Sequence, residues 1–169
     1  SHAKNKVRWC LNKAKKELQE GKKHRGLIIV DPDPKKAREH IAKAEHNLKV
    51  TLYLKEGGYT DWCSSSLFYT IYHCFLAVLA KEGYESRNQE CTFAIIANLI
   101  EEGKMAIPKE DLEKVSGLDL MESREASTAT SIREEYQYST KVTLESKEYE
   151  ELLQLAKRIL DATKERVEQ

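Results

Sequence analysis

The chain has 169 residues, which is enough for one domain with a sizeable core. Its 28 basic residues balance 28 acidic ones, so net charge alone draws it to no class of partner. No secretory, lipidation or membrane-spanning segment is recognised, and we expect no membrane partner.

All four cysteines are predicted to be free thiols. Cys63 and Cys74 fall on one predicted helix, about three turns apart, which is too far for a disulfide bond. Nothing in the spacing of Cys10 and Cys91 suggests a partner for either. Free thiols are typical of a reducing compartment, so we expect a cytoplasmic protein.

The first predicted element is a helix over residues 4–20 with a basic surface. Apolar side chains recur there at helical spacing in a narrow stripe, and Gly21 ends the pattern. Nine Lys or Arg residues but only two Glu residues lie between Lys4 and Arg25. Such an asymmetry is typical of a nucleic-acid-binding arm or of a solvated helix docked on an acidic body. Both interpretations remain open.

An extended arm follows over residues 26–34. Four consecutive apolar residues, Leu27 to Val30, precede two Asp-Pro steps, and a residue before proline avoids the helical conformation. We place the boundary of the chain's two parts here. Residues 1–33 form the N-terminal helix and arm, and residues 34–169 form the main helical bundle.

The main bundle is predicted to begin with two long helices. The first covers residues 34–56, with Asp33 as its cap and Pro34 at its first position. The second covers residues 61–83, is capped by Asp61 or Thr60, and ends at Gly83. Because this second helix is apolar nearly all round, Trp62 included, we expect neighbours to cover it on several sides.

The remaining helices follow after short breaks. We predict them over residues 86–102, opened by a Ser86–Gln89 capping box, over 108–116, closed by Gly117, over 118–138, and from Ser146 towards the C-terminus. No alternating hairpin pattern is present. The predicted fold class is therefore all-α, an up-and-down antiparallel helical bundle with an extra N-terminal helix and an extended arm.

The sequence contains no conventional enzyme motif. It has no HExxH pair for zinc, no GxxxxGK or GxGxxG loop for phosphates, and no GxSxG elbow. We therefore predict no metal site and no cofactor.

Two polar stretches stand out in the predicted helices. Tyr69, Tyr72 and His73 are placed on one side of the apolar helix, where their polar tips need partners in the core or at an interface. Arg133 lies one turn before Tyr136, beside two glutamates. An intrahelical ion pair would explain Arg133, and so would an anion-binding groove in which tyrosines stack on a base.

These residues carry a resemblance to a known family. The segments FYTIYHCFLAVLAKEGYESRN and REEYQYS, within residues 34–163, resemble a HEPN domain, and the basic helix with its arm is similar to an extension of some archaeal members. The resemblance implies a helical bundle that forms a homodimer. Family members include metal-independent ribonucleases and toxins paired with minimal nucleotidyltransferases, whereas inactive members are proposed to bind nucleotides or RNA.

The catalytic form of the family carries an Arg, four to six residues, then a His. The His helps to activate the ribose 2′-OH and the Arg neutralises charge on the phosphate. Arg133 matches this Arg, but after four intervening residues stands Tyr138, and no histidine follows His73. A tyrosine with a pKa of about 10 is a poor base at neutral pH. The family also carries a modifiable tyrosine two residues beyond the His, and the residue at that position in this chain is Thr140.

We therefore expect a binding module and not an enzyme. A nucleotide or RNA phosphate would be held in a dimer cleft by Arg133, Tyr136 and Tyr138, with contributions from His73 and Tyr69. Two alternatives stay open. One is a metal-independent endoribonuclease of a toxin–antitoxin pair, with Arg133 and Tyr138 as its catalytic candidates or with a base from the other subunit. The other is a structural dimer that docks a nucleotidyltransferase partner.

Overall fold

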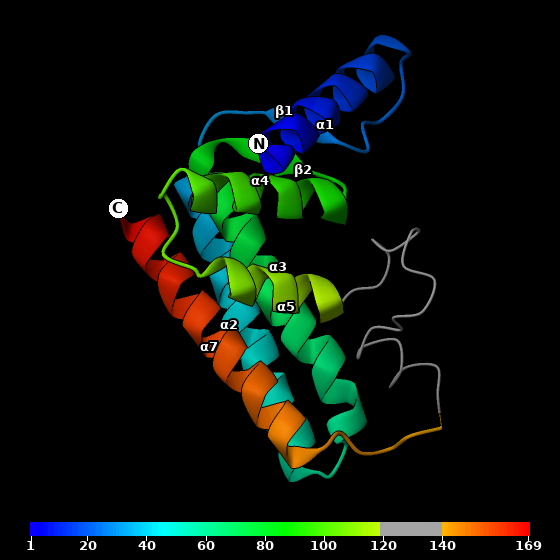
Figure 1. Cartoon of the computed structure of the whole chain (residues 1–169), viewed down its shortest axis with the longest axis vertical. Helices are drawn as coiled ribbons and strands as arrows, with labels where there is room; N and C mark the ends of the chain where they lie inside the picture. The colour runs from blue at the N-terminus through cyan, green and yellow to red at the C-terminus, as the bar shows by residue number, and fades with distance from the viewer. Residues whose placement is uncertain (119–139) are drawn as a thin grey trace.

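The computed structural model describes residues 1–118 and 140–169. In chain order these form α1 (His2–Gln19), β1 (Leu27–Ile29), α2 (Pro34–Glu56), the 3₁₀ turn η1 (Thr60–Trp62), α3 (Cys63–Glu82), β2 (Tyr84–Ser86), α4 (Gln89–Glu101), α5 (Lys109–Leu118) and α7 (Ser146–Glu168). Helices α2, α3 and α7 run along the long axis, α4 crosses one end, and α1 extends beyond that end (Figure 1). The all-α fold class is confirmed. Apart from Leu118, which ends α5, the helix predicted over 118–138 lies outside the described residues.

Helix α3 is the central helix, as its composition predicts. It packs against α2, α7, α4 and α5. Phe68 and Phe75 are completely buried on it. Its C-terminal cap is Gly83, whose φ of 84° is the left-handed conformation that glycine adopts without strain. A Cβ at this position would also lie 2.7 Å from the carbonyl oxygen of Val30, so a larger residue has no room.

The start of α3 differs from the prediction in two ways. The helix begins at Cys63, and neither Asp61 nor Thr60 caps it. The Thr60 hydroxyl instead accepts a hydrogen bond from the Leu144 amide at 2.9 Å, which ties the segment before α7 to η1. Trp62 is 54% exposed, so the expectation that neighbouring helices cover it is wrong. Composition could not reveal this, because the side chain sits on the turn that precedes the helix proper.

One stretch of the described chain, Thr60–Glu82, is long and apolar enough to pass a test for a membrane-spanning helix. Most of its apolar window, 67%, is buried inside the fold. A central helix of a bundle has this property because its neighbours provide the apolar surroundings.

Helices α2 and α3 pack closely through small side chains. The Oγ atoms of Thr51 and Ser66 lie 2.6 Å apart across the helix pair. Ala37 of α2 packs with Ala77 and Ala80 of α3. The predicted start of α2 is confirmed, since Asp33 accepts a hydrogen bond from the Lys36 amide at 2.9 Å and Pro34 opens the helix.

Polar side chains attach α7 to its neighbours. Arg158 donates two hydrogen bonds to Asp111 of α5, at 3.1 and 3.2 Å, and the Asp111 side chain is only 8% exposed. At the far end of α7, Arg166 donates to Glu82 at the end of α3. Both contacts join segments that are distant in sequence, so they fix α7 on the bundle.

The predicted arm is extended, and it pairs with a strand that the sequence does not indicate. Leu27 lies opposite Ser86 and Ile29 opposite Tyr84 in a two-stranded antiparallel sheet. The pairing spans only three residues on each side and shows no alternating pattern, which explains why β2 was missed. Ser86 does not form the predicted capping box, because Asn88 caps α4 through its side chain at 3.1 Å from the Cys91 amide.

The prediction of four free thiols is wrong for two of them. Cys10 of α1 and Cys91 of α4 form a disulfide bond across 81 residues of sequence. Cys63 and Cys74 are free and buried, as predicted. Sequence spacing carries no information on a contact between α1 and α4, and it is this contact that brings the two sulfur atoms together. The expected cytoplasmic location rested on the thiols and remains a prediction.

Candidate nucleotide-binding surface

Three of the five predicted binding residues lie outside the described residues. These are Arg133, Tyr136 and Tyr138, which belong to the undescribed range 119–139. Tyr69 and His73 are described. They are four residues apart on α3 and therefore share one side of that helix.

The structure separates Tyr69 from Tyr72. Tyr69 is 41% exposed, with its ring edge against Phe68 at 5.2 Å between ring centroids. The hydroxyl of Tyr72 instead lies 3.2 Å from the Thr92 hydroxyl of α4, and its ring packs near Phe93. Tyr72 is thus a packed residue whose polar tip is satisfied, whereas Tyr69 is available at the surface. The sequence pattern grouped the two because they are only three residues apart.

His73 forms a pair with a histidine that the sequence analysis did not select. Its Nδ1 lies 3.1 Å from Nδ1 of His40 on α2, and the ring centroids are 5.3 Å apart. Helical spacing in the sequence cannot reveal such a pair, because the two histidines are 33 residues apart and lie on different helices. Only knowledge of the α2–α3 register would have found His40.

The contact requires one ring to donate its Nδ1–H and the other to accept on a bare Nδ1. The accepting ring, when neutral, carries its proton on Nε2. The pair as a whole can therefore present one N–H donor and one bare nitrogen at its two Nε2 positions. Such a pair can bind a ligand as a neutral donor and acceptor.

Both imidazoles resist protonation. Burial first, and then the neighbouring His73 ring, lower the pKa of His40 to about 4. Burial, followed by the charge of Lys43, also lowers the pKa of His73. Both rings are consequently neutral at pH 7 and supply no positive charge to a phosphate.

The histidine pair predicts an acid-sensitive fold. An imidazole whose pKa is lower in the folded state than its ordinary value of 6.5 binds fewer protons when folded, so acid favours unfolding. The contribution of His40 is complete above about pH 6.5 and is lost as the pH falls towards 4. We expect the urea midpoint to drop over this window, and to drop less in His40→Asn. A wild-type pH profile in His40→Asn would contradict the role of the pair.

The remaining thiols are not suited to nucleophilic chemistry. Burial raises the pKa of Cys63 to about 11 and that of Cys74 to about 12. Both are therefore protonated at neutral pH, and a thiol is a far weaker nucleophile than a thiolate. In residues 1–118 and 140–169, no three His, Cys, Asp or Glu side chains come together as a metal site.

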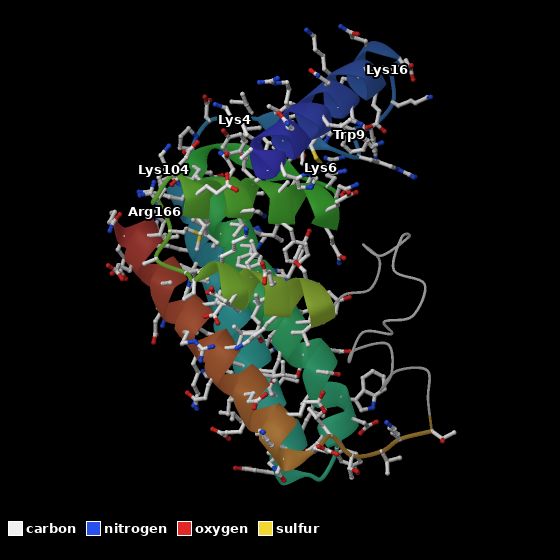
Figure 2. All side chains as sticks on the ribbon, viewed as in Figure 1. Lys4, Lys6, Trp9, Lys16, Lys104 and Arg166 are labelled. Atoms are coloured by element: carbon white, nitrogen blue, oxygen red, sulfur yellow. A yellow bond between two sulfur atoms is a disulfide. The ribbon has the colours of Figure 1, made fainter. Side chains whose placement is uncertain are left out.

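The basic N-terminal segment forms an exposed surface at one end of the molecule. Ala3, Val7, Cys10 and Ala14 are the buried residues of α1, which packs on α4 and β1. Gly26 permits the arm to lie directly on α1, since a Cβ there would be 2.5 Å from the Cys10 carbonyl oxygen. Of the lysines labelled in Figure 2, Lys4 and Lys16 lie exposed on α1, whereas Lys6 is partly buried and pairs with Glu90 of α4. The helix is therefore docked on the rest of the fold, and nucleic-acid binding by its exposed cations remains a prediction.

Comparison with known proteins identifies the bundle. A comparison with curated proteins finds no match. The model of the HEPN domain family matches residues 37–167. This range covers most of the chain and contains α3, α4, α5 and nearly all of α2 and α7, whereas α1 and β1 precede it. The chain therefore belongs to the HEPN domain family.

Proposed function

We propose that this protein is a binding module that holds a nucleotide or an RNA phosphate in the cleft of a homodimer. Arg133 supplies the positive charge, and Tyr136 and Tyr138 supply rings and hydroxyl groups. The observation that carries the proposal is the combination of a HEPN fold with Tyr138 at the place of the standard catalytic histidine. This sequence retains an arginine and aromatic rings that could bind a phosphate and a base, and it lacks the histidine that serves as the usual catalytic base.

The described residues support a contribution from α3. Tyr69 offers an exposed ring, and His73 lies one turn further along the same side. Because the His40–His73 pair is neutral at pH 7, it would recognise hydrogen-bonding groups of a ligand and not its charge. The guanidinium of Arg133 therefore carries the electrostatic part of the binding.

Exposed aromatic side chains support the homodimer. Tyr53, Tyr59 and Trp62 lie within ten residues at the α2–η1–α3 end and are 75%, 60% and 54% exposed. Aromatic residues gathered on a surface are typical of protein–protein interfaces. A second subunit covering this end would shield them from water.

Arg133→Ala is expected to weaken the binding of ATP or a short single-stranded RNA. A hydrogen bond to a charged group contributes about 1.5–3 kcal/mol, so the loss should be about ten- to a hundredfold in the dissociation constant. Isothermal titration calorimetry measures it directly. Arg38→Ala is the matched control, because Arg38 is an exposed arginine on the side of α2 opposite His40.

Two results would contradict this proposal. One is wild-type affinity in Arg133→Ala, and the other is no binding of either ligand by the wild-type protein. The same RNA should also stay intact with the wild-type protein in excess EDTA. Cleavage there, abolished by Arg133→Ala, would favour the endoribonuclease alternative, with Tyr138 or a residue of the other subunit as its base.

A further inference from the structure

A tryptophan lies in solvent on the basic helix α1. Trp9 is 48% exposed, and the ammonium group of Lys6 lies 4.0 Å from the centroid of its ring. Beyond Trp9 along the same side is an open hollow of about 460 Å³, lined by Trp9, Asn12, Lys13, Lys16, Glu17 and Glu20. Figure 2 shows Trp9 and Lys16 on the part of α1 that extends past the bundle. We call this surface the Trp9 face.

The two acidic residues of the Trp9 face are already satisfied. Glu17 accepts a hydrogen bond from the Arg25 amide at 3.0 Å and pairs with Lys13 at 3.4 Å. Glu20 pairs with Lys22 at 3.0 Å. Lys16 has no ion pair among the residues that the structure describes. Lys6 pairs with Glu90 of α4 and Lys13 with Glu17, so Lys16 is the lysine of this surface left to contact a ligand anion beside the exposed aromatic ring.

This combination matches one class of ligand. Proteins bind single-stranded nucleic acid by stacking bases on exposed aromatic rings while lysines contact the phosphates. Double-stranded nucleic acid keeps its bases stacked inside and offers only its phosphates to such a surface. The indole is then the feature that selects a single strand.

We propose that the Trp9 face binds single-stranded nucleic acid, with one base stacked on the indole and the adjacent phosphate contacted by Lys16. This goes beyond the proposed function, because α1 precedes the residues matched by the family and is separate in sequence from Arg133. The site would hold a strand without taking part in any reaction.

An anionic membrane surface fits the same charge less well. Membrane-bound amphipathic helices need a continuous apolar side. The apolar stripe of α1 is buried, and Cys10 within it is bonded to α4. Trp9 and Leu18, both exposed, are nine residues apart and so point to opposite sides of the helix. Neither side of α1 can therefore enter a bilayer while the bundle is intact.

Trp9 itself can report the binding. The chain contains two tryptophans, so Trp62→Phe leaves Trp9 as the only tryptophan, whose emission can be excited apart from that of the tyrosines. We expect added oligouridylate to quench this fluorescence, with an affinity that falls steeply as salt is added. Oligothymidylate in a parallel titration shows whether RNA is preferred over DNA.

Variants of the full chain locate the site, with a labelled oligonucleotide and fluorescence anisotropy. Trp9→Ala should weaken binding about 5- to 100-fold, the loss typical of removing a stacked aromatic ring. Lys16→Ala should weaken binding and reduce the dependence of log K on log salt by about 0.7. Lys15→Ala is the matched control, because Lys15 carries the same charge but is turned away from the hollow by about 100°.

The outcomes separate the two proposals. Equal losses in Lys15→Ala and Lys16→Ala, or unchanged binding by Trp9→Ala, would overturn the Trp9 face as a site. Oligonucleotide binding that is lost in Arg133→Ala but kept in Trp9→Ala would overturn it too, and would support the cleft. Quenching of Trp9 that survives Arg133→Ala would support the Trp9 face even if the cleft fails. Binding to phosphatidylserine vesicles but not to oligonucleotides would overturn it in favour of a membrane.

Discussion

Removal of the Cys10–Cys91 disulfide is expected to lower the free energy of unfolding by about 4.5 kcal/mol. The bond joins residues separated by 81 positions, and the chain-entropy relation gives this value for a loop of that length at 25 °C. The main effect is on the unfolded chain, which gains freedom when the link is absent. Urea or guanidinium unfolding of the oxidised protein and of the double variant Cys10→Ala/Cys91→Ala measures the difference.

A reducing agent provides the internal control for the disulfide. It should destabilise the wild-type protein and leave the double variant unchanged, because Cys63 and Cys74 are already free. Thiol titration of the unfolded, unreduced protein should find two thiols and not four. Four titratable thiols, or equal stabilities with and without reductant in the wild-type protein, would contradict the pairing.

Phe75→Ala is expected to destabilise the protein by about 3–5 kcal/mol, the usual cost of truncating a buried phenylalanine. Phe75 is completely buried on α3, and its ring packs edge-on against Phe93 of α4 at 5.8 Å between centroids. Truncation would leave a cavity where α3 and α4 meet. Denaturant unfolding followed by far-ultraviolet circular dichroism gives the change in free energy.

Leu18→Ala is the control for this change. Leu18 is also a large apolar residue on a long helix, but it is 50% exposed. Exposed substitutions usually change stability by no more than about 0.5 kcal/mol. A similar loss in both variants, or a loss below about 1 kcal/mol for Phe75→Ala, would mean that α3 is not the centre of the fold.

The order and ends of most helices could be predicted because local chemistry determines them. Asp33 caps the start of α2, and Pro34 fits the first position of a helix but not its interior. Gly83 adopts the left-handed backbone conformation that ends α3 and that other residues rarely adopt. The position of α3 in the centre followed from its lack of charge. Each of these inferences depends on residues that are close together in the chain.

The features that could not be predicted are contacts between distant segments. The Cys10–Cys91 bond, the Ile29–Tyr84 strand pair and the His40–His73 pair each need the three-dimensional arrangement of two elements. Composition and periodicity say which side of a helix is buried but not which neighbour covers it.

The candidate site was only partly predicted, because its side chains also depend on contacts between distant segments. Tyr69 and His73 were selected as polar residues on an apolar helix, and the structure places Tyr69 at the surface and His73 in a pair. Tyr72 looked equivalent, yet its hydroxyl meets Thr92 in the interior. The basic charge of α1 was visible in the sequence, whereas the pairing of Glu17 with Lys13 and of Glu20 with Lys22, and not with Lys16, was not.

The sulfur bridge between α1 and α4 has a consequence for a broken chain. Cys10 and Cys91 close a covalent ring that contains the arm, α2, η1, α3 and β2. The exposed turn at Gly57–Gly58 lies within that ring. A protease that nicks this turn would produce two pieces that remain one molecule, held together by the bridge until its sulfur atoms are reduced.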